Sequence, residues 1–212
     1  LGVAFASTGM SNTPAGGVKA EGTASQFGFN LGAIGKLSPG FDLDIDLSVV
    51  MPSASYEAGG GAPKIEASST TLMFNARAFY KGSSKFTYVP VISFGTESGT
   101  KTNAAGVSSD LASTTHIAVG FGIHYQMGDF LLAGGPSFML MNETTPSTTV
   151  SPELSNSAFS FPGWNLGLEW NLTDWLTARA GYVANTSAYT NESTATATTK
   201  NEMTGTMHDS DL

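Results

Sequence analysis

The links between the strand-like segments of this chain alternate strictly between very short and very long. Segments in which apolar and polar residues alternate predict nine strands, at residues 1–9, 27–37, 41–52, 70–80, 86–96, 115–126, 130–141, 161–172 and 175–185. The short links between them are 38–40, 81–85, 127–129 and 173–174. The long links, at 10–26, 53–69, 97–114 and 142–160, are rich in Ser, Thr, Gly, Ala and Asn. In an antiparallel meander, this alternation puts every tight turn at one end of the sheet and every long link at the other.

The clearest strand pattern starts at Phe41. Apolar residues occupy one face, at Phe41, Leu43, Ile45, Leu47 and Val49, and Asp42, Asp44, Asp46 and Ser48 occupy the other. A period of two indicates a strand with two chemically different sides. The segments 115–126 and 164–172 repeat it, whereas 130–141 is apolar on both faces and contains Pro136, so its inward face is ambiguous.

The low charge content favours a surface that does not face water. Only 12% of the residues are charged, about half of the ~25% usual in a soluble domain. No apolar run approaches the ~18 residues of a membrane-spanning helix. The absence of cysteine excludes a disulfide framework and a thiolate metal site. The net charge of −8 argues against a nucleic-acid partner.

Aromatic residues gather near the ends of the predicted strands. A band near the short turns forms a predicted aromatic girdle of Phe41, Tyr80, Phe86, Tyr88, Tyr125, Trp170 and Trp175. A looser set lies near the long links: Phe27, Phe74, Phe94, Phe159, Phe161 and Tyr182. Two aromatic bands at opposite strand ends are typical of the two interfaces of a membrane barrel. Strands of 9 to 12 residues, tilted by about 45°, are also long enough to cross a bilayer core.

These features predict an all-β, antiparallel, up-and-down transmembrane β-barrel. Residues 1–212 form a single domain in the bacterial outer membrane, with the short turns periplasmic and the long links as extracellular loops that are mainly mobile surface. Nine strands are visible, an odd number, so we expect ten or more in the full barrel and a chain that is incomplete at its C-terminus. Residues 186–206 are predicted to be a fifth long loop, and 207–212 could open a tenth strand.

The polar faces of the strands supply the candidate lumen. The predicted lumen-lining residues are Asp42, Asp44, Asp46, Arg77, His116, Gln126, Glu169 and Arg179. The three aspartates are either wall charges, paired with Arg77 or Arg179, or an acidic stripe that sets selectivity. Glu169 and Arg179 flank a two-residue turn and are predicted to form a cross-strand ion pair. Glycines on the same faces, at 120, 122, 167 and 181, leave room for a pore or for a plug.

No arrangement of residues indicates catalysis or a cofactor. His116 and His124 share a face but lie eight residues apart, about 26 Å along a strand, so they cannot hold one metal together. The Asp42–Asp46 series lacks the Gly and Glu of a calcium loop. We therefore expect neither an enzyme, nor a metal site, nor a bound cofactor.

Residues 164–182 carry a family resemblance. The segment has the pattern polar–Leu–Gly–apolar–Glu–aromatic, then a short Asp turn, then Leu–x–apolar–Arg–apolar–Gly–Tyr. This resembles a hairpin common in Gram-negative outer-membrane proteins, among them porin-like proteins and the long-chain fatty-acid transporter family. The resemblance implies an outer-membrane barrel and leaves the family open.

Three functions follow as hypotheses. The first is a passive channel for small solutes, which requires a polar lumen. The second is a hydrophobic-solute transporter, which requires an apolar patch in the lumen, with 130–141 as its candidate. The third is a structural or docking barrel whose lumen is filled by its own side chains. The expected partners are outer-membrane lipid, with small solutes and an oligomer or larger membrane assembly as further candidates.

Overall fold

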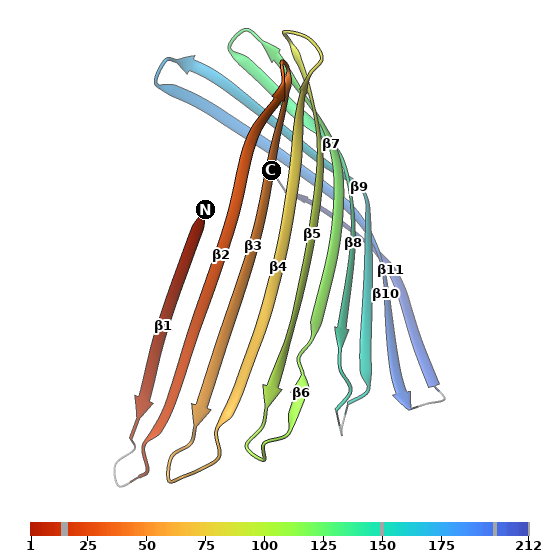
Figure 1. Ribbon diagram of the computed structural model, residues 1–212. Helices are drawn as coiled ribbons and strands as arrows, with labels where there is room; N and C mark the ends of the chain where they lie inside the picture. Colours follow the sequence, from red (N-terminus) through yellow and green to blue (C-terminus); the bar gives the residue numbers. More distant parts are fainter. Residues whose placement is uncertain (14–16, 149–150, 197–198, 212) are drawn as a thin grey trace.

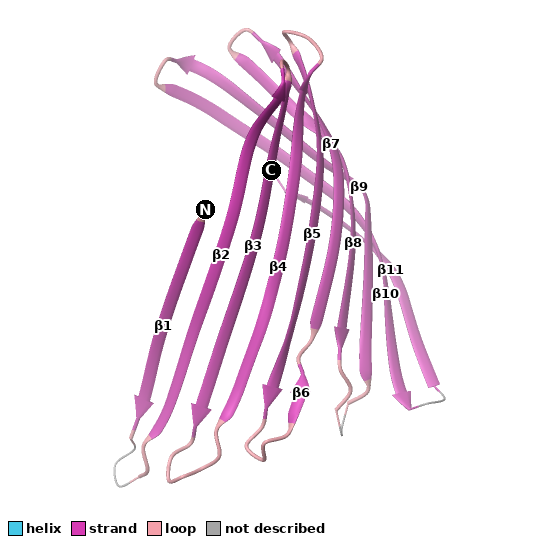
Figure 2. Cartoon of the chain, in the orientation of Figure 1, coloured by secondary structure: helices cyan, strands magenta, loops and turns pink. Residues whose placement is uncertain are grey.

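The computed structural model describes residues 1–13, 17–148, 151–196 and 199–211, which form one antiparallel sheet (Figure 1). Figure 2 shows strands joined by loops, and the described residues contain no helix long and apolar enough to cross a membrane. The strands are β1 (Gly2–Asn12), β2 (Ala20–Ser38), β3 (Phe41–Glu57), β4 (Ile65–Lys81), β5 (Phe86–Thr102), β6 (Ser108–Asp110), β7 (Ser113–Met127), β8 (Phe130–Thr145), β9 (Glu153–Thr173), β10 (Leu176–Thr196) and β11 (Thr199–Asp211).

The topology is an up-and-down meander. The strand order is β1-β2-β3-β4-β5-β7-β8-β9-β10-β11, and the short β6 pairs with β5 beside this path. The sheet curls, so that its last strands pass behind its first ones in Figure 1. It is not closed, because β1 and β11 are its two edges. The predicted all-β, up-and-down architecture is confirmed.

The four tight turns that match the predicted short links lie at one end of the sheet, the upper end in Figure 1. They occupy 39–40, 82–85, 128–129 and 174–175, within a residue of the predicted short links. Gly40 and Gly128 have φ of 84° and 59°, a left-handed conformation that glycine adopts without strain in such turns. The longer links lie at the opposite end, as predicted, but so does the connection from Thr196 to Thr199, where a fifth long link was expected.

The strands are longer than predicted, and most of each long link is strand. Residues 53–57 and 65–69, for example, extend β3 and β4 and pair with each other. The prediction of a loop at 186–206 is wrong, since β10 runs to Thr196 and β11 begins at Thr199, with Ala188 opposite Thr206. The tenth long strand thus starts well before the predicted 207. The paired parts of the other long links are likewise strand and not loop, and their mobility stays a prediction; residues 14–16, 149–150 and 197–198 lie outside the described residues.

The strand register gives the sheet two faces. Residues directly opposite each other in an antiparallel pair point to the same side, so Asp44, Arg77, Val91, Gly120 and Ser137 form one row across β3, β4, β5, β7 and β8. A hollow of about 540 Å³ lies on that side and is lined from six strands, β4, β5, β7, β8, β9 and β10. This side is the concave face, and the other is the convex face.

A bulge in β9 changes which residues of this strand point to the concave face. The pairing with β8 shifts by one residue between Ser137 and Met139, opposite the Phe161-Pro162 segment. Because of this shift, Ser160 and Gly163 both lie on the concave face although their spacing is odd. The register also resolves the ambiguity of 130–141: Leu131 and Ala133 face the concave side, and Leu132 faces the convex side.

Candidate functional site

The convex face carries a belt of apolar side chains that no other part of the described chain covers. On β7 this face is formed by Ile117, Val119, Phe121, Ile123 and Tyr125. Phe121 is 46% exposed, and its register partner across β5–β7 is Pro90, itself apolar. β5 adds another apolar column with Phe86, Tyr88, Pro90, Ile92 and Phe94. Eight residue steps along such a column span roughly 27 Å of strand, so the belt matches the apolar band of a barrel wall.

Neither face of the sheet buries a core of the kind found in a soluble sandwich. Among the described residues with characterised side chains, Val89 is the one apolar side chain that is buried, at 5% exposure. Large apolar residues such as Ile92, Leu166 and Trp170 are instead more than 40% exposed. A water-soluble chain would leave these side chains unfavourably hydrated, whereas a bilayer covers them.

The predicted girdle residues lie on the convex face at the tight-turn end, except Trp175, which belongs to the turn itself. They meet in cross-strand pairs: Tyr80 stacks on Tyr88 with ring centroids 6.3 Å apart, and Phe86 contacts Tyr125 at 4.7 Å. Trp170 stacks on Phe130 at 5.0 Å. Phe41 is the register partner of Tyr80.

The second aromatic set forms a looser row. Phe74 lies opposite Phe94, and Leu140 lies opposite Phe159, all on the convex face. Tyr182 lies nearer the tight turns, opposite Leu166. The aromatic residues of the row near the long links are therefore phenylalanines. Tyr80, Tyr88, Tyr125 and Trp170 lie at the tight-turn rim, and Trp164 lies farther along the convex face of β9, opposite Pro136.

The apolar belt, the aromatic rim, the long tilted meander and the one-sided tight turns together fit a Gram-negative outer-membrane β-barrel. A bilayer requires every backbone group of a spanning segment to be paired within the protein, which a meander of hydrogen-bonded strands achieves everywhere except at its edges. The outer membrane is the location that this architecture fits.

The strand register places all eight predicted lumen residues on the concave face. Each belongs to the same alternation as the row through Arg77. Gln126 turns back and donates from Nε2 to the carbonyl of Gly128 in the adjacent turn. Their role in lining a closed lumen stays a prediction, because the sheet is open.

Ion pairs link the charged residues of this face. Arg77 Nε donates to Asp44 Oδ2 at 2.7 Å, and Arg179 Nε donates to Glu169 Oε1 at 3.0 Å. Asp46 accepts a hydrogen bond from the Asn30 amide instead of an ion pair. Both arginines are more than half exposed, so these pairs organise the local field and contribute little to stability.

Two lysines that sequence reasoning missed complete this charged region. Lys81 Nζ lies 4.0 Å from Asp42 Oδ2, and Lys36 is the register partner of Asp42 on β2. Three cations, Lys36, Arg77 and Lys81, therefore flank the three aspartates. The signal was available in the sequence, because Lys81 alternates in phase with Arg77 on its own strand, and Lys36 lies close to the short turn that leads to Asp42.

The concave face changes character away from the tight turns. The hollow of about 540 Å³ lies over the middle of β4–β10 and is lined mainly by small or apolar residues, including Val89, Val91, Ala118, Gly120 and Val183. Arg77, Phe79 and His124 lie along its edge toward the tight turns. The Phe79 and His124 rings are 6.2 Å apart, and the Arg77 guanidinium lies 5.5 Å from the Phe79 ring centre.

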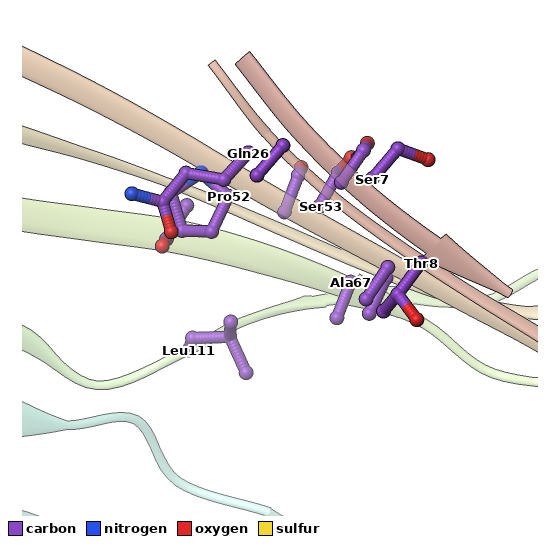
Figure 3. Close-up of a pocket in the computed structure, with 13 residues that line it drawn as sticks. Ser7, Thr8, Gln26, Pro52, Ser53, Ala67 and Leu111 are labelled. Atoms are coloured by element: carbon purple, nitrogen blue, oxygen red, sulfur yellow. Dashed lines mark hydrogen bonds between the residues drawn. The ribbon is translucent and has the colours of Figure 1, made fainter. Parts of the chain in front are cut away.

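On β1–β4 the concave face near the long links is lined by small, uncharged residues, whereas Glu97 on β5 and Glu143 on β8 lie on this face opposite Thr114. A second hollow of about 430 Å³ on β1–β4 is lined largely by alanine, serine and threonine. Figure 3 shows Gln26 beside its register partner Pro52, and Leu111 approaching from the segment that follows β6.

His116 lies over Gly95 on the neighbouring strand. A Cβ atom at Gly95 would lie 2.1 Å from His116 Cε1, so the glycine makes room for the imidazole. Among the residues whose side chains are described, no group of three or more His, Asp or Glu could hold a metal ion.

The comparisons with known proteins found likeness in fold only. No protein-family model matches the chain, and neither does any curated protein. Among solved structures, the translocator domain of autotransporter NalP from Neisseria meningitidis is similar, with a TM-score of 0.41 and 14% identity over 99% of this chain and 75% of that one. The beta domain of the Bordetella autotransporter BrkA gives a TM-score of 0.39 and 10% identity over 99% and 92%. Both scores lie below 0.5, so activity must be inferred from this chain's own residues.

Proposed function

We propose that this outer-membrane barrel is a passive channel for small solutes, with the concave face as the wall of its lumen. The observation that carries the proposal is the distribution of side chains on that face. Its ends are polar, its middle is hollow, and charges of both signs lie side by side at its tight-turn end: Lys36, Arg77 and Lys81 beside three aspartates, and Arg179 on Glu169. Balanced charges at that end give a solute no strong electrostatic barrier or trap there, which suits weakly selective diffusion.

The proposed orientation places the tight turns in the periplasm and the long hairpins outside the cell. The charged region would then lie at the periplasmic mouth of the lumen. The proposed partners are outer-membrane lipid on the convex face and small polar solutes in the lumen, and we propose no enzymatic activity.

Single-channel recording of the purified full chain in planar bilayers tests the proposal. We expect open steps with a cation-to-anion permeability ratio close to one. A protein whose folding is verified by far-UV circular dichroism, but which never conducts, would contradict the channel and support a docking barrel with an occluded lumen.

A second candidate is transport of hydrophobic solutes. The apolar lining of the hollow over β5–β10 favours it, and this patch is broader than the single strand 130–141 expected from the sequence. Swelling of liposomes that contain the protein separates the two functions. Rapid swelling in small sugars supports the passive channel, whereas exclusion of sugars together with uptake of apolar solutes supports the second candidate.

A further inference from the structure

Glycines that the backbone does not require keep the hollow open. A Cβ atom added at Gly120 or Gly181 would meet its nearest neighbour at 3.6 or 3.7 Å, and at Gly167 it would do so at 3.9 Å. These are ordinary van der Waals contacts, and none of the three glycines has a positive φ. Gly95 differs, because the His116 ring occupies the place of its Cβ. The strands would accept larger residues around the hollow, so an open surface is what these glycines provide.

The edge of the hollow offers donors for an anion. Asp44 accepts from Nε of Arg77, which is one of five N–H donors on a guanidinium. His124, on the other side of Phe79, carries at least one ring N–H in either protonation state. The Phe79 ring approaches both groups, with its centre 6.2 Å from the His124 ring and 5.5 Å from the Arg77 guanidinium. Two donors and an aromatic ring therefore border an apolar floor.

We propose that the hollow binds a small aromatic carboxylate. The ring of the ligand would lie on the part of the hollow next to these donors, over Val91 on β5 and Gly120 and Gly122 on β7, with one edge against Phe79. Its carboxylate would accept hydrogen bonds from Arg77 and His124. A volume of about 540 Å³ is within the range of small-molecule sites. This inference rests on the barrel of the proposed function and does not require that the barrel conducts.

Equilibrium binding to the full chain in detergent micelles provides the first test, with 2-naphthoate as the probe. The neutral 2-naphthamide tests the need for the carboxylate, and octanoate tests the need for the ring. We expect naphthoate to bind at least tenfold more tightly than either. Equal affinity for naphthamide would overturn the anion contact, equal affinity for octanoate would overturn the aromatic class, and absence of naphthoate binding would overturn the site.

Filling the hollow provides the second test. Gly120→Val and Gly122→Val place branched side chains, which strands accept well, into the hollow beside Arg77 and His124; a Cβ atom at Gly122 would meet nothing closer than 3.5 Å. We expect each to weaken naphthoate binding by tenfold or more. Gly28→Val is the matched control, because Gly28 lies on the same face, its Cβ would meet nothing closer than 3.9 Å, and it lies on β2 away from the hollow. If both filling variants fold and bind as the wild type does, the ligand does not occupy this hollow.

The third test removes the anion contact without leaving an unpaired charge. The double variant Arg77→Met with Asp44→Asn keeps the formal charge of the face unchanged. We expect the double variant to bind naphthoate more weakly than the wild type does, with an affinity close to that for naphthamide. Its affinity for naphthamide should equal that of the wild type. An unchanged ratio of the two affinities would contradict the role of Arg77. Conductance of the same preparations separates the proposals: binding without conductance refutes the channel and keeps the site, and conductance without binding does the reverse.

Discussion

An arginine on the convex face should destabilise the protein far more than an arginine one residue away on the concave face. Val119 and Ala118 are neighbours on β7, and the register places Val119 in the apolar belt and Ala118 beside the hollow. If the belt faces lipid, Val119→Arg places a charge in hydrocarbon. Ala118→Arg leaves the charge in a lumen that water fills.

The position of Val119 in the belt sets the magnitude. The convex column of β7 runs from Ile117 to Tyr125, about 27 Å along the strand, and Val119 lies one alternation inside its outer end. Arginine costs about 2–4 kcal/mol near the midplane of a barrel and about 0–1 kcal/mol near an interface. Val119 lies between the outer interface and the midplane, so we expect Val119→Arg to lower the free energy of unfolding by about 1–3 kcal/mol, and Ala118→Arg or Tyr125→Arg by about 1 kcal/mol or less.

Urea titration of the protein folded into lipid vesicles measures these differences. Ile92→Arg and Ser93→Arg on β5 repeat the comparison on a second strand, since Ile92 is convex and Ser93 is concave. Equal costs for the members of each pair would refute the lipid-facing belt. A larger cost at Ala118 and Ser93 would mean that the concave face is the packed side of a soluble sheet.

Three further predictions concern single contacts. Gly95→Ala should destabilise the protein by about 1–3 kcal/mol, because the new methyl group displaces the His116 ring; a double-mutant cycle with His116→Ala should recover most of the loss, and purely additive effects would contradict the contact. Asp44→Asn releases Arg77 and should shift the reversal potential in a salt gradient toward anion preference, with a stability change of about 0–1 kcal/mol; an unchanged reversal potential would place Arg77 outside the ion path. Phe130→Ala and Trp170→Ala remove one stacked pair and should show a coupling energy of about 0.5–1.5 kcal/mol in urea titrations, whereas zero coupling would show that the rings do not stabilise each other.

The strands were predictable where their two faces meet different surroundings. Residues 41–49 alternate because lipid and lumen differ, and the structure places Asp44 and Leu47 on opposite faces as expected. The signal disappears at Ser53 and Ser55, which continue β3 with a hydroxyl ladder to Ser25 and Thr23. Both faces of the hairpin lie beyond the apolar belt at this point, so both meet the same surroundings. Apolar and polar residues therefore do not alternate, and the sequence resembles that of a loop.

The candidate site was predictable in composition and less so in arrangement. The alternation of apolar and polar residues along each strand is enough to assign Asp42, Arg77 and Glu169 to the polar face. The pairing of Lys81 with Asp42 depends on the register across β3–β4, and the contact between Phe79 and His124 spans β5. Such contacts depend on the curvature of the sheet, which no local pattern specifies. The bulge at Phe161-Pro162 changes parity within β9, which alternation alone would have assigned wrongly.

The uneven placement of Tyr and Trp has a consequence for membranes of different thickness. These residues favour the headgroup level because they join an apolar ring to a hydrogen-bonding group, and they gather at the tight-turn rim, at Tyr80, Tyr88, Tyr125 and Trp170. The depth of the barrel is then fixed at one leaflet. At the opposite rim, the phenylalanine row gives way to Ser and Thr on strands that continue unbroken, so the water boundary there can move along the wall at a cost of fractions of a kcal/mol per Å. A difference between the height of the apolar belt and the thickness of the bilayer would then be accommodated at the long-link end alone. The charged region at the tight-turn end would keep its position in the membrane.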